Sequence, residues 1–78
     1  MVKNPTLDTT KDVFVVMLEY YDYNQSYHVI QGVFASREEA LRIAREQNAK
    51  LKKDSYYEWD VYSVPMNTLG EYGEKIGL

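Results

Sequence analysis

A run of six apolar residues at positions 13–18 limits what this chain can fold into. The run, Val-Phe-Val-Val-Met-Leu, is too short for a solitary buried helix and is rich in β-branched residues, so it predicts a strand. Side chains of a strand alternate between two faces, and both faces are apolar here. The rest of the chain offers one convincing helix, which covers one face. The other face is therefore expected to be covered by a partner, a ligand or the C-terminal tail.

The size and composition indicate one small domain. The chain has 78 residues and no cysteine, which excludes disulfides and cysteine metal sites, and its single histidine, His28, argues against zinc. The net charge of −3 argues against binding to duplex nucleic acid. No apolar stretch approaches the roughly 20 residues of a membrane span, and the N-terminus lacks a secretory signal. We therefore expect a cytoplasmic protein without metal, cofactor or membrane contact.

Local patterns predict the order strand, strand, helix, strand. The strands are expected at about residues 12–21, 27–34 and 56–64, with a turn at 22–26. Ser36 and Glu39 form a capping box, which predicts a helix from residue 37 to about residue 52. Residues 1–11 are interpreted as a flexible leader, 12–68 as the domain and 69–78 as a tail. The tail is open to three readings, a short edge strand, a poor helix or a disordered segment, and partial order near 67–69 is favoured.

The topology follows from the rule that crossovers are right-handed. A helix joining the second and third strands lets the first strand, the most apolar one, lie between them. The expected fold is therefore α+β, with a three-stranded antiparallel sheet in the order 2-1-3 and one helix packed on one face. An extra C-terminal edge strand is compatible with this arrangement.

Strand parity predicts which side chains face the helix. On the second strand, counting back from Phe34 in steps of two places Gly32, Ile30 and His28 on the helix side. On the first and third strands, the carboxylates are expected to avoid the core. The residues that then face the helix are Phe14, Val16, Leu18, Tyr20, Tyr57, Trp59 and Val61. The open face then carries Val13, Val15, Met17, Glu19, Tyr27, Val29, Gln31, Val33, Glu58, Asp60 and Tyr62. A bulge at Gly32 would reverse the parity of the second strand and move Val29 and Val33 into the core.

The open face, with its apolar centre and its rim of tyrosine and charge, is typical of an interaction surface. We therefore predict a non-catalytic protein-binding, regulatory or accessory protein, which self-associates as a homodimer or binds another protein through this face. The expected contact residues are Val15, Met17, Tyr20, Tyr23, Tyr27, Val29 and Tyr62.

Two other functions are open alternatives. The first is single-stranded nucleic-acid binding by Tyr20, Tyr23 and Tyr62 with the basic end of the helix, although carboxylates on the sheet would repel phosphate. The second is inhibition of a host enzyme or defence system, as by a small phage protein. Catalysis is not expected, because the sole acid–base set, His28 with Glu19, Glu58 or Asp60, is divided between two faces by the predicted parity.

One segment carries a family resemblance. Residues 32–40, Gly-Val-Phe-Ala-Ser-Arg-Glu-Glu-Ala, followed by the aromatic strand at 57–62, resemble the middle of small uncharacterised bacterial and phage proteins. The resemblance covers about residues 13–68. It implies a compact ββαβ fold and an accessory role, and it implies no activity, cofactor or site residue.

Overall fold

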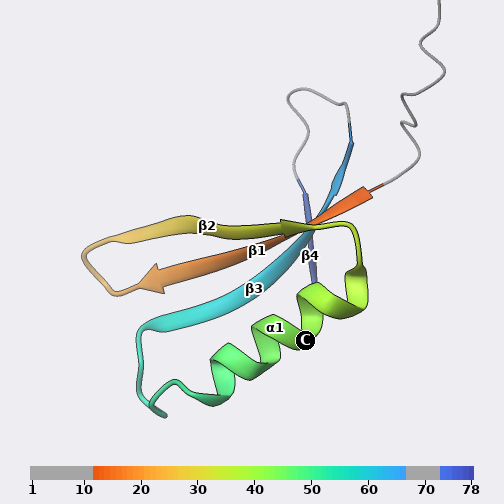
Figure 1. Ribbon diagram of the computed structural model, residues 1–78. Helices are drawn as coiled ribbons and strands as arrows, with labels where there is room; N and C mark the ends of the chain where they lie inside the picture. Colours follow the sequence, from red (N-terminus) through yellow and green to blue (C-terminus); the bar gives the residue numbers. More distant parts are fainter. Residues whose placement is uncertain (1–11, 67–72) are drawn as a thin grey trace, which may run out of the picture.

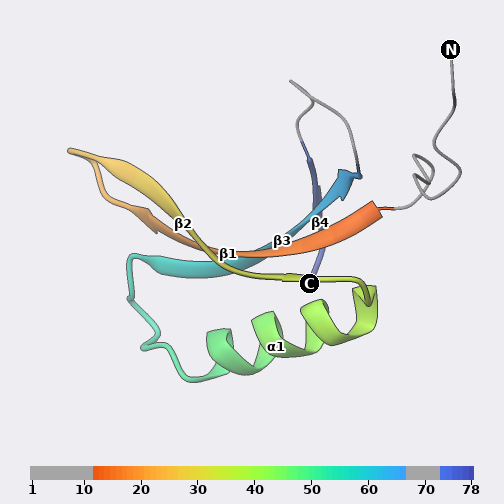
Figure 2. The same ribbon diagram turned by 45° about the horizontal axis from the view of Figure 1, so that its top comes forward.

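The computed structural model describes residues 12–66 and 73–78, which form a four-stranded antiparallel sheet with a helix on one face (Figure 1). The elements are β1 (Asp12–Tyr21), β2 (Ser26–Phe34), α1 (Arg37–Ala49), β3 (Tyr57–Pro65) and β4 (Glu74–Ile76). The sheet order is β2-β1-β3-β4, and Figure 2 shows α1 beneath the sheet. The predicted leader and the predicted order near 67–69 lie outside the described residues.

The predicted fold class is confirmed. The apolar strand β1 lies between β2 and β3, so the order 2-1-3 is as expected, and β4 adds the C-terminal edge strand beside β3. The core lies between β1, β3 and α1, where Val16 and Val61 meet Ala40, Leu41 and Ala44. The two buried alanines of α1, Ala40 and Ala44, allow the helix to approach the sheet closely, because they have no side chain beyond Cβ.

The helix begins where the capping motif predicts and ends slightly earlier than expected. Ser36 Oγ accepts a hydrogen bond from the backbone N–H of Glu39 at 3.2 Å, which satisfies one of the free donors of the first turn. At the other end, Lys50 donates to Gln47 at 3.1 Å and Leu51 donates to Asn48 at 3.1 Å. These tighter i to i−3 bonds close the helix at Ala49 rather than near residue 52.

A bulge in β2 corrects the predicted faces of that strand. Val16 pairs with Gly32, whereas the next residue of β1, Met17, pairs with Ile30, so Gln31 is the extra residue. Beyond the bulge the parity reverses. The predictions for His28 and Ile30 are therefore wrong, since both lie on the open face, and those for Tyr27 and Val29 are wrong, since both lie on the helix side.

The bulge adjoins Gly32, whose missing side chain leaves room for the ring of Phe34. A Cβ atom built at Gly32 would lie 2.8 Å from a ring carbon of Phe34, because that ring fills the space beside the strand. Val33 pairs with Val15 and remains on the open face. Val29 changes sides as the bulge argument anticipated, but it stays 43% exposed and does not enter the core.

The outer edge of β3 is covered along much of its length. The side chain of Asn48 bonds to both backbone groups of Trp59, donating from Nδ2 to the carbonyl and accepting the N–H at Oδ1, each at 2.8 Å. Ser55 Oγ accepts the N–H of Tyr57 at 3.0 Å, and β4 pairs with residues 61–63. Asn48 thus serves as a substitute for a neighbouring strand.

We expect Asn48→Ala to lower the free energy of unfolding by about 2 kcal/mol, because both backbone groups of Trp59 lose their partners in a half-buried position. Gln47→Ala, at the adjacent half-buried position, is the matched control and should cost less than about 1 kcal/mol. Urea denaturation measures both values. Equal costs for the two variants would contradict the role assigned to Asn48.

Candidate functional site

The face of the sheet opposite α1 carries an apolar recess. Its volume is about 380 Å³, and it is lined by Val15, Met17, Ile30, Tyr62, Val64 and Gly73. Two apolar side chains of β2 on this face are exposed to solvent, Ile30 of the recess at 62% and Val33 outside it at 57%. The open face therefore presents both a hollow and protruding apolar groups.

An acidic cluster lies next to the recess on the same face. The carboxylates of Glu19 on β1 and Asp60 on β3 are buried, with 1% and 3% of each residue exposed. Lys75 of β4 places its Nζ 3.6 Å from Glu19 Oε1 and 3.3 Å from Asp60 Oδ2, and 3.8 Å from Glu58 Oε2. The cation from β4 therefore compensates the charges that the two inner strands bring together.

Glu19 has two further polar neighbours. The Tyr62 hydroxyl donates a hydrogen bond to Glu19 Oε2 at 2.6 Å, and His28 Nδ1 lies 3.2 Å from the same oxygen. His28 reaches this carboxylate because the bulge turns it to the open face. The argument that separated His28 from the carboxylates is therefore wrong, and all four strands of the sheet contribute to the cluster.

The two buried carboxyl groups have opposite pKa shifts. Burial raises the pKa of Asp60 to about 7, and its hydrogen bond with Glu19 and the nearness of Glu58 act in the same direction. For Glu19, burial also favours the neutral form, but hydrogen bonds from Asp60, Tyr62 and Tyr21 and the charge of Lys75 outweigh it, so the pKa falls to about 2. Glu19 thus carries the charge while Asp60 retains its proton below neutral pH.

The same environment affects the other members of the cluster. Burial and the hydrogen bond to Glu19 raise the pKa of Tyr62 to about 12. Burial lowers the pKa of Lys75, but the charges of Asp60 and Glu19 more than reverse this, so Lys75 stays protonated. A substrate would have to reach carboxylates that are almost fully buried. The absence of catalysis stays a prediction, and the evident role of the cluster is to join β4 to the sheet.

A second group of interest is a cluster of tyrosines where the β1–β2 hairpin extends past the C-terminal end of α1 (Figure 1). The Tyr20 ring stacks on Tyr27 with centroids 5.1 Å apart and lies 5.0 Å from Tyr57 and 6.0 Å from Tyr56. The Tyr20 hydroxyl donates to Asp22 at 2.6 Å, and this bond raises the pKa of Tyr20 to about 12. The cluster forms an aromatic platform on the helix side of the sheet.

The predicted contact residues are divided among separate places. Val15, Met17 and Tyr62 line the recess, as the predicted open face requires, and the Tyr62 hydroxyl also binds Glu19. Tyr20 and Tyr27 belong to the tyrosine cluster, and Val29 lies on the helix side of β2. Tyr23 is almost fully exposed in the hairpin loop.

Sequence reasoning missed three residues of the open face, namely Ile30, His28 and Lys75. Gly32 was the available signal for the first two, because a glycine inside a strand can mark a bulge. For Lys75, the glycine-rich C-terminal segment showed no periodicity that would have placed it on the sheet.

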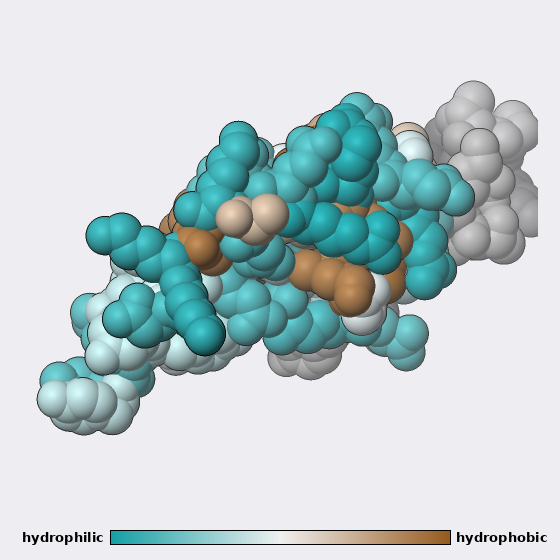
Figure 3. Space-filling view, turned by 90° about the horizontal axis from the view of Figure 1, so that it is seen from below, coloured by the Kyte–Doolittle hydropathy of each residue, from teal (hydrophilic) through white to brown (hydrophobic). Residues whose placement is uncertain are grey.

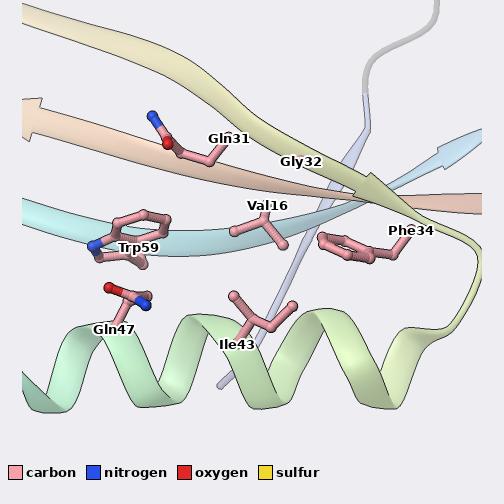
Figure 4. A pocket seen from close by; sticks show the side chains of 7 residues that line it. All are labelled: Val16, Gln31, Gly32, Phe34, Ile43, Gln47 and Trp59. Carbon is pink, nitrogen blue, oxygen red and sulfur yellow. The ribbon is translucent and has the colours of Figure 1, made fainter.

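The helix side of β2 is also partly uncovered. A shallow pocket of about 170 Å³ lies between β2 and α1, where Val16, Phe34 and Ile43 point toward one another and Trp59 lies over Gln47 (Figure 4). The surface on this side is mostly hydrophilic, with hydrophobic areas between the polar side chains (Figure 3). Because α1 packs on β1 and β3, the outer strand receives little cover from the helix.

In residues 12–66 and 73–78, no helix is long and apolar enough to cross a membrane. Within the same ranges, no group of three or more His, Cys, Asp or Glu side chains is arranged to hold a metal ion.

The fold and the open face define a small α+β domain, with a helix on one side of an antiparallel sheet and an apolar recess on the other. Residues 11–76 match a family model described as "Domain of unknown function (DUF7336)", and the chain belongs to this family. No curated protein and no solved structure was found to match the chain.

Proposed function

We propose that this protein is a non-catalytic, cytoplasmic accessory protein that acts by protein binding, and that it binds a second copy of itself through the apolar part of the open face. The observation that carries the proposal is the pair of exposed side chains, Ile30 and Val33, beside an apolar recess on a sheet face that the helix leaves uncovered. Exposed apolar groups gathered in this way usually mark an interaction site.

The charges of the open face favour this proposal. The buried carboxylates beside the recess are paired with Lys75, so a second copy would not meet uncompensated negative charge at the centre of the contact. The face also carries both apolar protrusions and an apolar hollow. A two-fold contact requires such self-complementarity, because the same patch serves on both copies.

We expect Ile30→Glu to raise the dimer dissociation constant at least about tenfold, because a buried charge would replace an apolar contact. Tyr56→Glu is the matched control, since it adds the same charge at a similarly exposed residue (58%) on the helix side, and it should leave the constant unchanged. Light scattering after size-exclusion chromatography measures the mass at several concentrations. A parent protein that stays monomeric up to millimolar concentration would refute the proposal.

The tyrosine cluster supports a second candidate function, the binding of single-stranded nucleic acid. Tyr27, Tyr56 and Tyr57 expose part of their rings, and stacking on such rings is a common way to bind bases. The structure changes the predicted set, because Tyr62 lies in the acidic cluster rather than on this platform. Titration with mixed oligonucleotides should then quench tyrosine fluorescence in a salt-dependent way, and Tyr27→Ala should weaken the effect. Inhibition of a host enzyme stays a prediction.

A further inference from the structure

The two edges of the sheet are treated differently. The outer edge of β3 is occupied by β4, by the Asn48 side chain and by Ser55. On the other side of the sheet, β2 is the last strand, and no backbone bond to its outer edge occurs within the described part of the chain. An open strand edge is a template for pairing with another strand.

The register shows which backbone groups of β2 are free to pair. The N–H of Tyr21 donates to Tyr56 at 3.0 Å, so the odd-numbered residues of β1 direct their backbone groups toward β3 and the even-numbered ones toward β2. The β2 residues opposite the even-numbered positions, such as Tyr27 and Val29, therefore bond inward. His28 and Ile30 consequently direct their N–H and C=O groups away from the sheet.

The side chains of β2 do not protect this edge. Natural edge strands are usually blunted by charged residues or proline, yet β2 contains no Asp, Glu, Lys, Arg or Pro, although the chain has 21 charged residues (9 basic and 12 acidic). Apolar groups are exposed on both of its faces, with Tyr27 and Val29 on the helix side and Ile30 and Val33 on the open side. The bulge at Gln31 still leaves residues 26–30 regular.

We propose that β2 pairs with β2 of a second copy, antiparallel and about a two-fold axis, so that the two four-stranded sheets become one continuous sheet of eight strands. This inference rests on the proposed self-association and specifies its geometry: the exposed side chains of β2, Ile30 among them, lie at the seam, and the rest of the open face stays outside the contact. Residues 26–30, between the hairpin turn and the bulge, form the new ladder, in which His28 and Ile30 supply backbone hydrogen bonds.

A second copy suits this edge because of its charge. The segment 26–30 has no fixed charge and the chain carries −3 elsewhere, so two copies can meet at β2 without like charges facing each other. A two-fold axis perpendicular to the sheet also keeps both helices on the same side. The uncovered side chains of β2 on either face then contact their counterparts across the seam, which removes from water the apolar surface that α1 leaves exposed.

Two lysine variants separate edge pairing from stacking of the open faces. Val29→Lys places a charge at the seam, on the helix side, and should raise the dissociation constant at least about tenfold. Val13→Lys places the same charge on the open face of the central strand, outside the recess and away from the seam, and should change the constant less than about twofold. The reverse pattern would overturn edge pairing while leaving the proposed self-association intact.

Amide hydrogen exchange of the parent protein gives a readout that does not depend on any variant. In the paired dimer, the amides of His28 and Ile30 should be protected at concentrations above the dissociation constant and exchange rapidly on dilution. A dimer in which these amides exchange rapidly at every concentration would overturn the inference. A monomeric parent would overturn both the inference and the proposed function, and would leave the edge to a strand of another protein.

Discussion

Glu19→Ala is expected to lower the free energy of unfolding by about 3 kcal/mol, the largest effect that we expect from a single polar side chain of this protein. The substitution leaves the Tyr62 hydroxyl without its acceptor at 2.6 Å and removes a partner of Lys75 and His28. It also opens a cavity, because Glu19 is 1% exposed. Chemical denaturation at pH 7 measures the loss.

Glu58→Ala is the matched control for this prediction. Glu58 pairs with Glu19 across the sheet and lies 3.8 Å from the same Lys75, but its side chain is half exposed. Exposed ion pairs contribute little, so the expected loss is below about 1 kcal/mol. Similar losses in the two variants would show that burial of the Glu19 carboxylate does not stabilise the sheet.

Asp60→Asn is expected to make the protein more stable than its parent at pH 8.5, by on the order of 2 kcal/mol, and about equally stable near pH 4. The pKa of Asp60 is raised to about 7 by burial and by its acidic neighbours. Below that pH the parent holds a neutral carboxyl group, which an asparagine amide imitates because it can still donate toward Glu19. Above it, the parent must hold a second buried negative charge, which the variant lacks.

The signs of the two pKa shifts fix the pH profile of the parent. Asp60 is raised from 3.8 to about 7, so its contribution is complete below pH 3.8 and is lost as the pH rises through 7. Glu19 is lowered from 4.5 to about 2, so its contribution is present above pH 4.5 and is lost as the pH falls through 2. Stability should therefore be greatest near pH 4, between the two unfolded-state pKa values.

Denaturation of parent and variant from pH 4 to 9 tests this profile. The free energy of unfolding of the parent should decline toward alkaline pH, and that of Asp60→Asn should not. Glu46→Gln, an exposed change on α1, should show the same decline as the parent. If Asp60→Asn were the less stable protein at pH 8.5, the ionised Asp60 would be stabilised by Lys75, 3.3 Å away, more than it is destabilised by Glu19.

Sequence reasoning succeeded where a structural feature depends on residues that are close together along the chain. The apolar run on β1, the carboxylates of β3 and the Ser36 cap predicted the strand order, the helix start and the faces of both inner strands, because burial and capping act on neighbouring residues. Sequence reasoning failed on β2, because counting in steps of two from Phe34 did not account for the extra residue Gln31. One inserted residue exchanges the two faces of every position beyond it.

The sequence by itself determined that this chain forms an α+β domain with an apolar central strand and a sheet face that its helix cannot cover. Only the tertiary structure decided which side chains lie on that face. The bulge turned His28 and Ile30 onto it, and β4 brought Lys75 to two carboxylates that were expected on the open face without a partner from the tail. The physical reason is that burial of a charge depends on partners distant in sequence, whereas strand and helix patterns depend on residues close along the chain.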